Sequence, residues 1–109
     1  MRVYIAGPMS GLPANNYPAF NQAAEDLADV GFEPLNPVNV SKHCNGSCKH
    51  DWQWYMRRTL TMMLTADRVA LLPGWENSRG ATIENDLALS IGIPVTTIDH
   101  LLYTDAVRP

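Results

Sequence analysis

The segment Ser78–Glu84 combines the residue types in this chain that are best suited to chemistry. It follows an apolar run and carries a hydroxyl, a guanidinium and, six residues after the serine, a carboxylate. Ser78 is expected to cap a helix, and the free N–H groups of a helix start, with Arg79 beside them, suit an anion. On that helix Glu84 shares a stripe with Gly80 and Ala88, one turn to either side, which leaves space around the carboxylate. The same spacing also fits a solvated glutamate on a helix that packs through its small residues.

A second cluster follows the first apolar run, in the loop Gly7-Pro8-Met9-Ser10-Gly11. Gly7 lets the backbone turn at the end of a strand, and Gly11 leaves the loop free to wrap around a ligand. The glycine spacing matches neither a P-loop nor the dinucleotide-binding fingerprint. We therefore interpret Gly7, Pro8, Ser10 and Gly11 as candidate ligand contacts, and the loop alone does not indicate a ligand class.

The aromatic residues divide into two groups. Trp75 lies in the loop before the candidate helix start and is a candidate to flank a base or a sugar. Trp52 and Tyr55 are three residues apart, so they share one face of a helix, and we expect that face to pack in the core. The sequence thus predicts one aromatic ligand contact and one aromatic core face.

The residues His43, Cys44, Cys48 and His50 form a third cluster with two thiols and two imidazoles. These side chains bind zinc, but structural zinc sites usually draw their four ligands from two separate parts of a motif. Here all four fall in one short segment. We expect a polar surface loop, no bound metal, and no requirement for a cofactor.

The elements that must position these residues alternate between short apolar strands and amphipathic helices. Strands are predicted at 2–6, 32–36, 68–72 and 94–98, and helices at about 17–31, 51–66 and 80–91. This alternation predicts one three-layer α/β domain over residues 1–109, with a parallel sheet of four to five strands. Ligands bind beyond the carboxyl ends of such strands, which selects the segments 7–16, 37–50 and 73–79, the first two of them predicted loops. The last residues are expected to add a short helix or a partner contact.

Composition narrows the class of ligand. The 109 residues are 46% apolar and 17% charged, with a net charge of −3. These values exclude a disordered chain, and an acidic chain without a basic stripe is a poor candidate for binding a nucleic acid polymer. No apolar run approaches the roughly 20 residues of a membrane span, and the N-terminus does not have the pattern of a signal peptide. We therefore expect a cytoplasmic protein that binds a small molecule, with cysteines that are thiols.

Four segments together resemble a known family. They are Tyr4-Ile5-Ala6-Gly7-Pro8, the pair Ala66-Asp67, the segment Ser78–Glu84, and Gly92-Ile93-Pro94-Val95. Over residues 2–98 the chain resembles the nucleoside 2-deoxyribosyltransferase-like superfamily, in particular its compact phage and bacterial branch. That superfamily includes deoxyribosyltransferases and 2′-deoxynucleoside 5′-monophosphate N-glycosidases. The resemblance implies a flavodoxin-like sheet, a nucleotide or nucleoside ligand, and a homodimer or larger homo-oligomer with sites near subunit interfaces.

The resemblance also implies roles for individual residues. Glu84 matches the family nucleophile, Tyr4 matches a tyrosine at the mouth of the active site, and Ser78 falls where nucleotide-cleaving members bind the 5′-phosphate. The implied reaction is cleavage of an N-glycosidic bond or transfer of the deoxyribosyl group. A carboxylate suits this chemistry because it stabilises the positive charge that builds at C1′, or bonds to that carbon.

Two other functions stay open from the sequence. The glycosidases of this superfamily carry an aspartate about two turns before the Ala-Asp pair, and this chain has Arg57-Arg58-Thr59 there. A protein without that acid could bind a nucleotide as a sensor or regulator and not cleave it. A domain that binds a protein partner through its aromatic surface is the third possibility. Arg57, Arg58 or Arg79 could supply the cation that the family places in its first loop.

Overall fold

The computed structural model describes residues 1–42 and 51–106, and a parallel sheet forms its centre. The strands are β1 (Arg2–Ala6), β2 (Glu33–Leu35), β3 (Arg68–Leu71) and β4 (Val95–Thr97). The helices are α1 (Tyr17–Asp29), α2 (Val38–Lys42), α3 (Trp52–Met63), α4 (Arg79–Ser90) and α5 (Ile98–Ala106). The predicted α/β class is confirmed, with four strands in the described residues.

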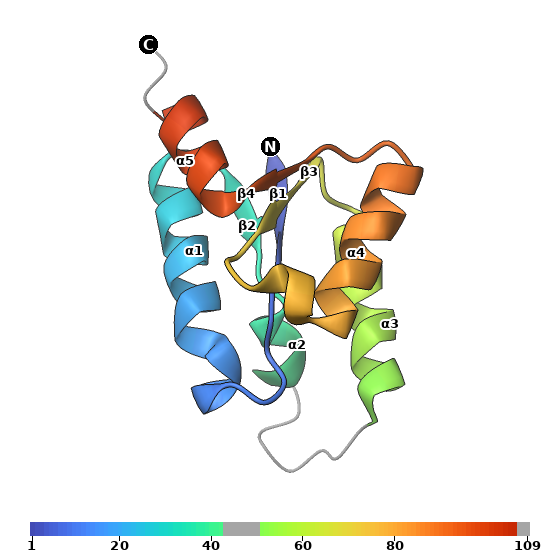
Figure 1. The fold of residues 1–109 in the computed structure, drawn as a ribbon. Coiled ribbons are helices and arrows are strands. Elements are labelled where there is room, and N and C mark those ends of the chain that lie inside the picture. Colours follow the sequence, from blue (N-terminus) through green and yellow to red (C-terminus); the bar gives the residue numbers. More distant parts are fainter. Residues whose placement is uncertain (43–50, 107–109) are drawn as a thin grey trace.

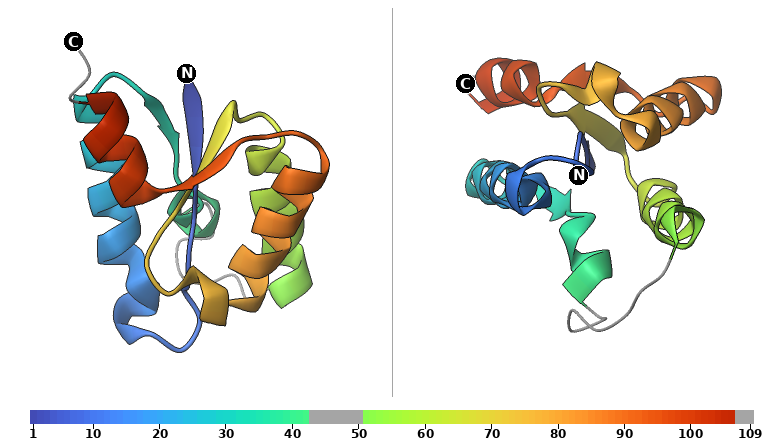
Figure 2. Two further views of the ribbon diagram at one scale, coloured as in Figure 1. Left: turned by 45° about the horizontal axis from the view of Figure 1, so that its top comes forward. Right: turned by 60° about the horizontal axis from the view of Figure 1, so that its bottom comes forward.

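The strand order is β2-β1-β3-β4, and each neighbouring pair is parallel. Helices α1 and α5 cover one face of the sheet, and α3 and α4 cover the other (Figures 1 and 2). This is the three-layer arrangement that the alternation of strands and helices predicted, with the flavodoxin-like sheet that the family resemblance implied. From β1 the chain continues to β2 on one side and then returns to β3 on the other side. In sheets of this kind, ligands usually bind in the crevice at the carboxyl ends of the two strands where the direction changes, here β1 and β3.

The first strand shows how the sheet separates its two faces. Val3 and Ile5 point to one side, and Tyr4 and Ala6 point to the other, because side chains alternate along a strand. The first pair packs in a core with Phe20, Leu27 and Leu101 from α1 and α5. The second pair packs in a core with Met63 of α3 and Ala88 of α4. Tyr4 therefore lies on the side of the sheet that carries the candidate helix with Glu84.

Gly7 lies where β1 and β3 end side by side. The amide of Leu72 donates to the carbonyl of Ala6 at 2.8 Å, and a Cβ on Gly7 would lie 2.7 Å from the Cβ of Leu72. We expect Gly7→Ala to lower the free energy of unfolding by about 1–3 kcal/mol, because one of the two strand ends must move. Denaturant titration measures the change, with Ser10→Ala in the same loop as a control that stays within about 0.5 kcal/mol of wild type. An unchanged midpoint for Gly7→Ala would show that the strand ends can separate at no cost.

The expectation of a continuous loop over 37–50 is wrong for Val38–Lys42, which form the short helix α2. The helix start is supported by Asn36, whose Oδ1 accepts from the amide of Val38 at 3.1 Å and whose Nδ2 donates to Oδ1 of Asn21 at 2.9 Å. Val38 and Val40 are buried, which fixes the helix against the core. Five residues are too few to show a helical period, so the sequence pattern did not reveal it.

The loop before α1 contains an unusual backbone. Ala14, Asn15 and Asn16 have φ angles of 53°, 52° and 60°, in the left-handed region that few residues other than glycine adopt. The side chain of Asn16 donates to the carbonyl of Pro8 at 2.9 Å and so ties the end of the loop to its beginning. Local strain of this kind is retained where the surrounding structure needs it. Here it brings Asn15 to the cavity described next.

Candidate functional site

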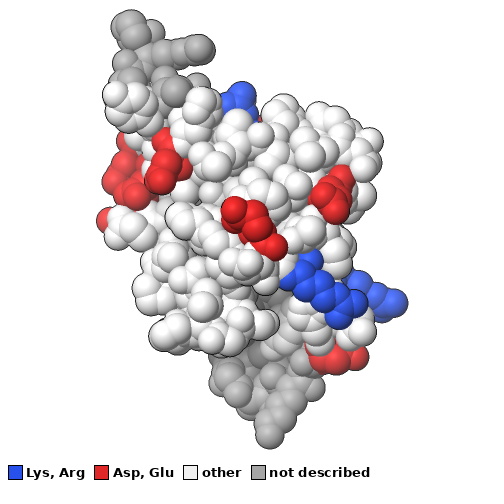
Figure 3. Space-filling model, viewed as in Figure 1, with Lys and Arg blue, Asp and Glu red and all other residues white. Residues whose placement is uncertain are grey.

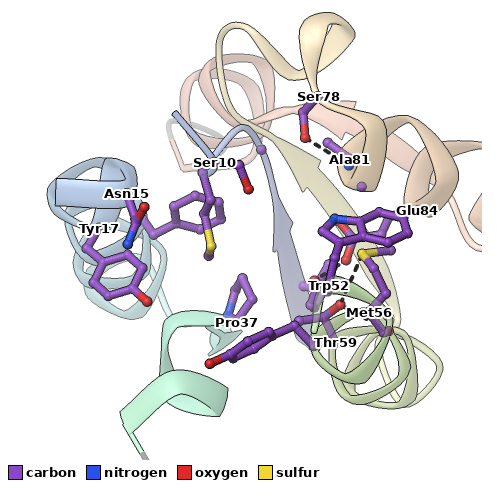
Figure 4. A pocket seen from close by; sticks show the side chains of 16 residues that line it. Ser10, Asn15, Tyr17, Pro37, Trp52, Met56, Thr59, Ser78, Ala81 and Glu84 are labelled. Atoms are coloured by element: carbon purple, nitrogen blue, oxygen red, sulfur yellow. Dashed lines mark hydrogen bonds between the residues drawn. The ribbon is translucent and has the colours of Figure 1, made fainter. Parts of the chain in front are cut away.

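A cavity of about 390 Å³ opens at the carboxyl ends of β1 and β3, where the strand order reverses (Figure 4). Its walls come from the end of β1 and the following loop, from the beginning of α1, from α3 and from the beginning of α4. The lining residues are Tyr4, Gly7, Met9, Ser10, Asn15, Tyr17, Phe20, Pro37, Trp52, Tyr55, Met56, Thr59, Ser78, Gly80, Ala81 and Glu84.

Glu84 and Tyr4 form a buried pair in this cavity. Glu84 is 5% exposed and Tyr4 is 1% exposed, and the hydroxyl of Tyr4 donates to Oε2 of Glu84. Ala81 and Ala88 lie one turn to either side on α4 and are also buried, so the helix lies close to the sheet. Of the two possibilities that the spacing allowed for Glu84, the structure thus has the carboxylate in a pocket and not in solvent.

Burial changes the acidity of both groups. It raises the pKa of Glu84 from 4.5 to about 7, because the charged carboxylate loses its contact with water. Hydrogen bonds from Tyr4 and from Thr59 lower the pKa of Glu84 and oppose part of this effect. Burial, the nearby carboxylate and their hydrogen bond all raise the pKa of Tyr4 well above 10, so its hydroxyl remains a donor. A carboxyl with a pKa near neutrality is typical of a group that takes part in a reaction.

Helix α3 contributes a stripe that the sequence pattern assigned to the core. Trp52, Tyr55, Met56 and Thr59 recur at steps of three and four residues and all line the cavity. The expected core packing of Trp52 and Tyr55 is therefore wrong. Both side chains are partly buried, and Figure 4 shows the Trp52 ring beside Glu84. Thr59 was no clear signal of a cavity, because its hydroxyl donates to the carbonyl of Met56 at 3.2 Å and so finds its partner within its own helix.

A second, smaller cavity of about 250 Å³ adjoins the first at the beginning of α4. It is lined by Pro8, Met9, Ser10, Trp52, Asn77, Ser78, Arg79 and Gly80. Ser78 caps α4 as predicted, since its Oγ accepts from the amide of Ala81 at 3.2 Å. The two cavities share the lining residues Met9, Ser10, Trp52, Ser78 and Gly80, so they lie next to each other.

The structure brings most of the predicted site residues together. Tyr4, Gly7, Ser10, Ser78, Gly80 and Glu84 line the main cavity, and Pro8 and Arg79 line the second. Trp75 lines neither of these cavities and packs against the core on the α3–α4 side of the sheet. Gly11 also lies outside both linings, and its φ of +82° shows that it serves the turn of the loop. Asn15, Tyr17, Phe20 and Pro37 line the main cavity and were missed by sequence reasoning.

Residues 1–42 and 51–106 contain no cluster of three or more His, Cys, Asp or Glu side chains that could hold a metal ion. The segment with His43, Cys44, Cys48 and His50 lies outside the described residues, so the expectation that it binds no metal stays a prediction. No helix in the described part of the chain is long and apolar enough to cross a membrane.

Comparison with known proteins gives a family and a fold. Among solved structures, the chain is similar to a 2-deoxyribosyltransferase from the psychrotolerant bacterium Bacillus psychrosaccharolyticus, with 16% sequence identity and a TM-score of 0.64. The match covers 87% of this chain and 69% of the other, and it confirms the expected deoxyribosyltransferase-like fold. No curated protein matches the sequence. A family model described as a domain of unknown function, DUF4406, matches residues 1–97. This protein therefore belongs to the DUF4406 family.

Proposed function

We propose that the protein cleaves, or transfers through, the N-glycosidic bond of a 2′-deoxynucleoside 5′-monophosphate, with Glu84 as nucleophile. The observation that carries the proposal is the buried Glu84 carboxylate with its Tyr4 partner in a cavity with aromatic walls. Aromatic side chains suit the planar base, and the carboxylate suits the cationic C1′ of the transition state. The fold shared with a 2-deoxyribosyltransferase supports the same chemistry.

The reaction has two steps on this proposal. In the first, a carboxylate oxygen of Glu84 bonds to C1′ as the C1′–N bond breaks. The electron pair of the broken bond stays on the base, which takes a proton from water. In the second step, water attacks C1′ as the bond to Glu84 breaks, and the carboxylate and the free sugar phosphate are formed. The proton that this water loses neutralises the hydroxide left when the base was protonated. Transfer differs only in that a second base attacks C1′ in place of water.

The two adjoining cavities support a nucleotide as the substrate. Glu84 follows Ser78 by six residues on α4, which corresponds to about 9 Å along a helix. The sugar therefore has its C1′ near Glu84 and its 5′-phosphate near Ser78, with the base against Trp52 and Tyr55. Asn15 adds an amide that can donate to or accept from the edge of a base.

A panel of 2′-deoxynucleosides, their 5′-monophosphates and the matching ribonucleotides tests the proposal. The protein is incubated with each compound, and free base is measured by chromatography. We expect release from at least one deoxynucleoside monophosphate. The alternative, a sensor that binds nucleotides without cleaving them, is favoured by Thr59, which lines the cavity from the segment of α3 where the glycosidases carry an acid. Tight binding of a nucleotide with no base released from any compound would establish the sensor.

The Tyr4 hydroxyl is expected to set the pH at which the enzyme works. Tyr4→Phe removes a hydrogen bond that favours the ionised form of Glu84, so the pKa of this carboxyl rises further above 7. A hydrogen bond to a charged group contributes about 1.5–3 kcal/mol, which corresponds to roughly one to two pH units. We therefore expect the acidic limb of the rate profile to move up by about one unit, with activity partly regained at alkaline pH. The exposed Tyr103→Phe is the matched control. If Tyr4→Phe lowered the rate equally at every pH and left the acidic limb of the profile in place, this role of Tyr4 would be contradicted.

The expected homo-oligomer is part of the proposal. Several apolar side chains of α4 and of the chain after α3 lie at the surface, namely Leu64, Ile83, Leu89 and Ile91. A second copy of the chain would cover such side chains.

A further inference from the structure

The first side chain of α4 lies against the first side chain of α3. The Cζ atom of the Arg79 guanidinium lies 4.2 Å from the ring centroid of Trp52, within the range of a cation–π contact. Gly80, the next residue, faces the same helix: a Cβ there would be in ordinary van der Waals contact with Cζ2 of Trp52, at 3.9 Å, and would lie 3.0 Å from the sulfur of Met56. Trp52 therefore connects the beginnings of two helices at the second cavity.

The contact has a consequence for the charge of Arg79. Within the part of the chain that the structure describes, Arg79 forms no salt bridge, so a carboxylate does not neutralise it there. An exposed arginine normally samples many rotamers, and a ligand that binds it must restrict them. The Trp52 ring restricts them in advance while the N–H groups of the guanidinium fork remain available to an anion.

The surroundings of the guanidinium suit a phosphate group. Arg79 lines the second cavity together with the hydroxyl side chains of Ser10 and Ser78. A guanidinium and two hydroxyls are donors that a phosphate dianion accepts from. Figure 3 shows Lys and Arg atoms side by side over α3 and the beginning of α4, with further basic atoms at the top of the molecule and acidic atoms next to both sides of the group over the helices.

A second arginine–tryptophan pair in the same chain serves as a control for this arrangement. Arg58 lies over the ring of Trp54 at 4.1 Å, which is a cation–π contact of the same kind. Neither residue lines either cavity. The Arg58–Trp54 pair therefore makes the same kind of contact as Arg79–Trp52, but it lies outside both cavities.

We propose that Arg79 is the residue that selects a 5′-phosphorylated nucleotide over the free nucleoside, and that Trp52 is the positioning residue that holds it over the second cavity. This inference rests on the proposed function, because it assigns the phosphate of the same substrate. From the sequence, Arg57, Arg58 and Arg79 are all candidates for the cation that binds the phosphate. Only Arg79 remains, because Arg57 and Arg58 line neither cavity.

The test compares affinities for one 2′-deoxynucleoside and its 5′-monophosphate by calorimetry. Wild type is expected to prefer the monophosphate by at least about tenfold, which is roughly 1.4 kcal/mol. Arg79→Gln loses this preference and keeps its affinity for the nucleoside. Trp52→Leu weakens both ligands, because the ring also lines the main cavity, but it too loses the preference, and Trp52→Phe restores part of it. Arg58→Gln and Trp54→Leu, the matched controls, keep the wild-type ratio.

Inorganic phosphate, titrated against the amide signals of Ser78–Gly80 by NMR, separates this inference from the proposed function. Phosphate binding that Arg79→Gln abolishes would support the inference even if no base were ever released. A wild-type preference for the monophosphate that persists in Arg79→Gln would overturn the inference and leave the proposed function standing. If wild type binds neither phosphate nor nucleotide, both are overturned.

Discussion

Replacement of Glu84 by glutamine is expected to slow the release of free base by at least about a thousandfold, which is roughly 4 kcal/mol of barrier. Glutamine keeps the shape of the side chain and an oxygen that accepts from Tyr4, but it has no charge to offer C1′. The positive charge at C1′ exists in the transition state and not in the bound substrate. The loss should therefore appear in kcat, while the affinity for the nucleotide changes little.

Glu25→Gln is the matched control, because it makes the same chemical change on an exposed position of α1. Its kcat and KM should equal those of wild type. Rates are measured with saturating monophosphate, and affinity is measured by calorimetry on the same preparations. A Glu84→Gln protein with more than about a tenth of the wild-type rate would show that the carboxylate is not the nucleophile.

Wild-type stability is expected to fall as the pH rises from about 4.5 to 7, and Glu84→Gln should lack this part of the decrease. The pKa of Glu84 is about 7 in the folded protein and 4.5 as an ordinary carboxyl, so the folded state binds the proton more tightly than the unfolded state. Between these two values the folded state holds more protons, and its stability therefore decreases with rising pH. Above pH 7 both states are ionised and the contribution is constant.

The variant should therefore be more stable than wild type at pH 8, by about 1–3 kcal/mol, and nearly equal to it at pH 5. Denaturant titration at these two pH values measures the difference, and Glu25→Gln should show none at either pH. If Glu84→Gln and wild type differed in stability by the same amount at both pH values, ionisation of Glu84 would not destabilise the folded protein. A variant that gains stability and loses activity would identify Glu84 as a group retained for function.

The architecture follows from the sequence because its signals are local. The buried strands are short and apolar, and the helices between them repeat at three and four residues, so their alternation is enough to predict a parallel α/β sheet. Ligands bind beyond the carboxyl ends of such strands, and this rule selects the segments that contain Gly7, Ser10 and Ser78. All three residues line the main cavity.

The other half of the cavity could not be predicted in the same way. A helical stripe such as Trp52, Tyr55 and Thr59 predicts a face turned toward the protein, but its period does not say whether that face meets the core or a cavity. Asn15 reaches the cavity through consecutive left-handed residues, a backbone that depends on the contact between Asn16 and the carbonyl of Pro8. The first feature depends on how distant segments pack together. The second depends on a hydrogen bond between residues eight apart in one loop, which hydrophobic periodicity does not record.

A single-turnover experiment shows whether the bond at C1′ breaks through attack by Glu84. Protein in excess is mixed with a bound 2′-deoxynucleoside 5′-monophosphate, the mixture is quenched at intervals, and free base is quantified, with Glu84→Gln in parallel. One turnover suffices, so slow product release or slow protonation of the base does not hide the reaction. We expect wild type to release one base per bound nucleotide and Glu84→Gln to release none on the same time scale. Bound nucleotide that stays intact in wild type, or equal release by both proteins, would exclude Glu84 as the nucleophile.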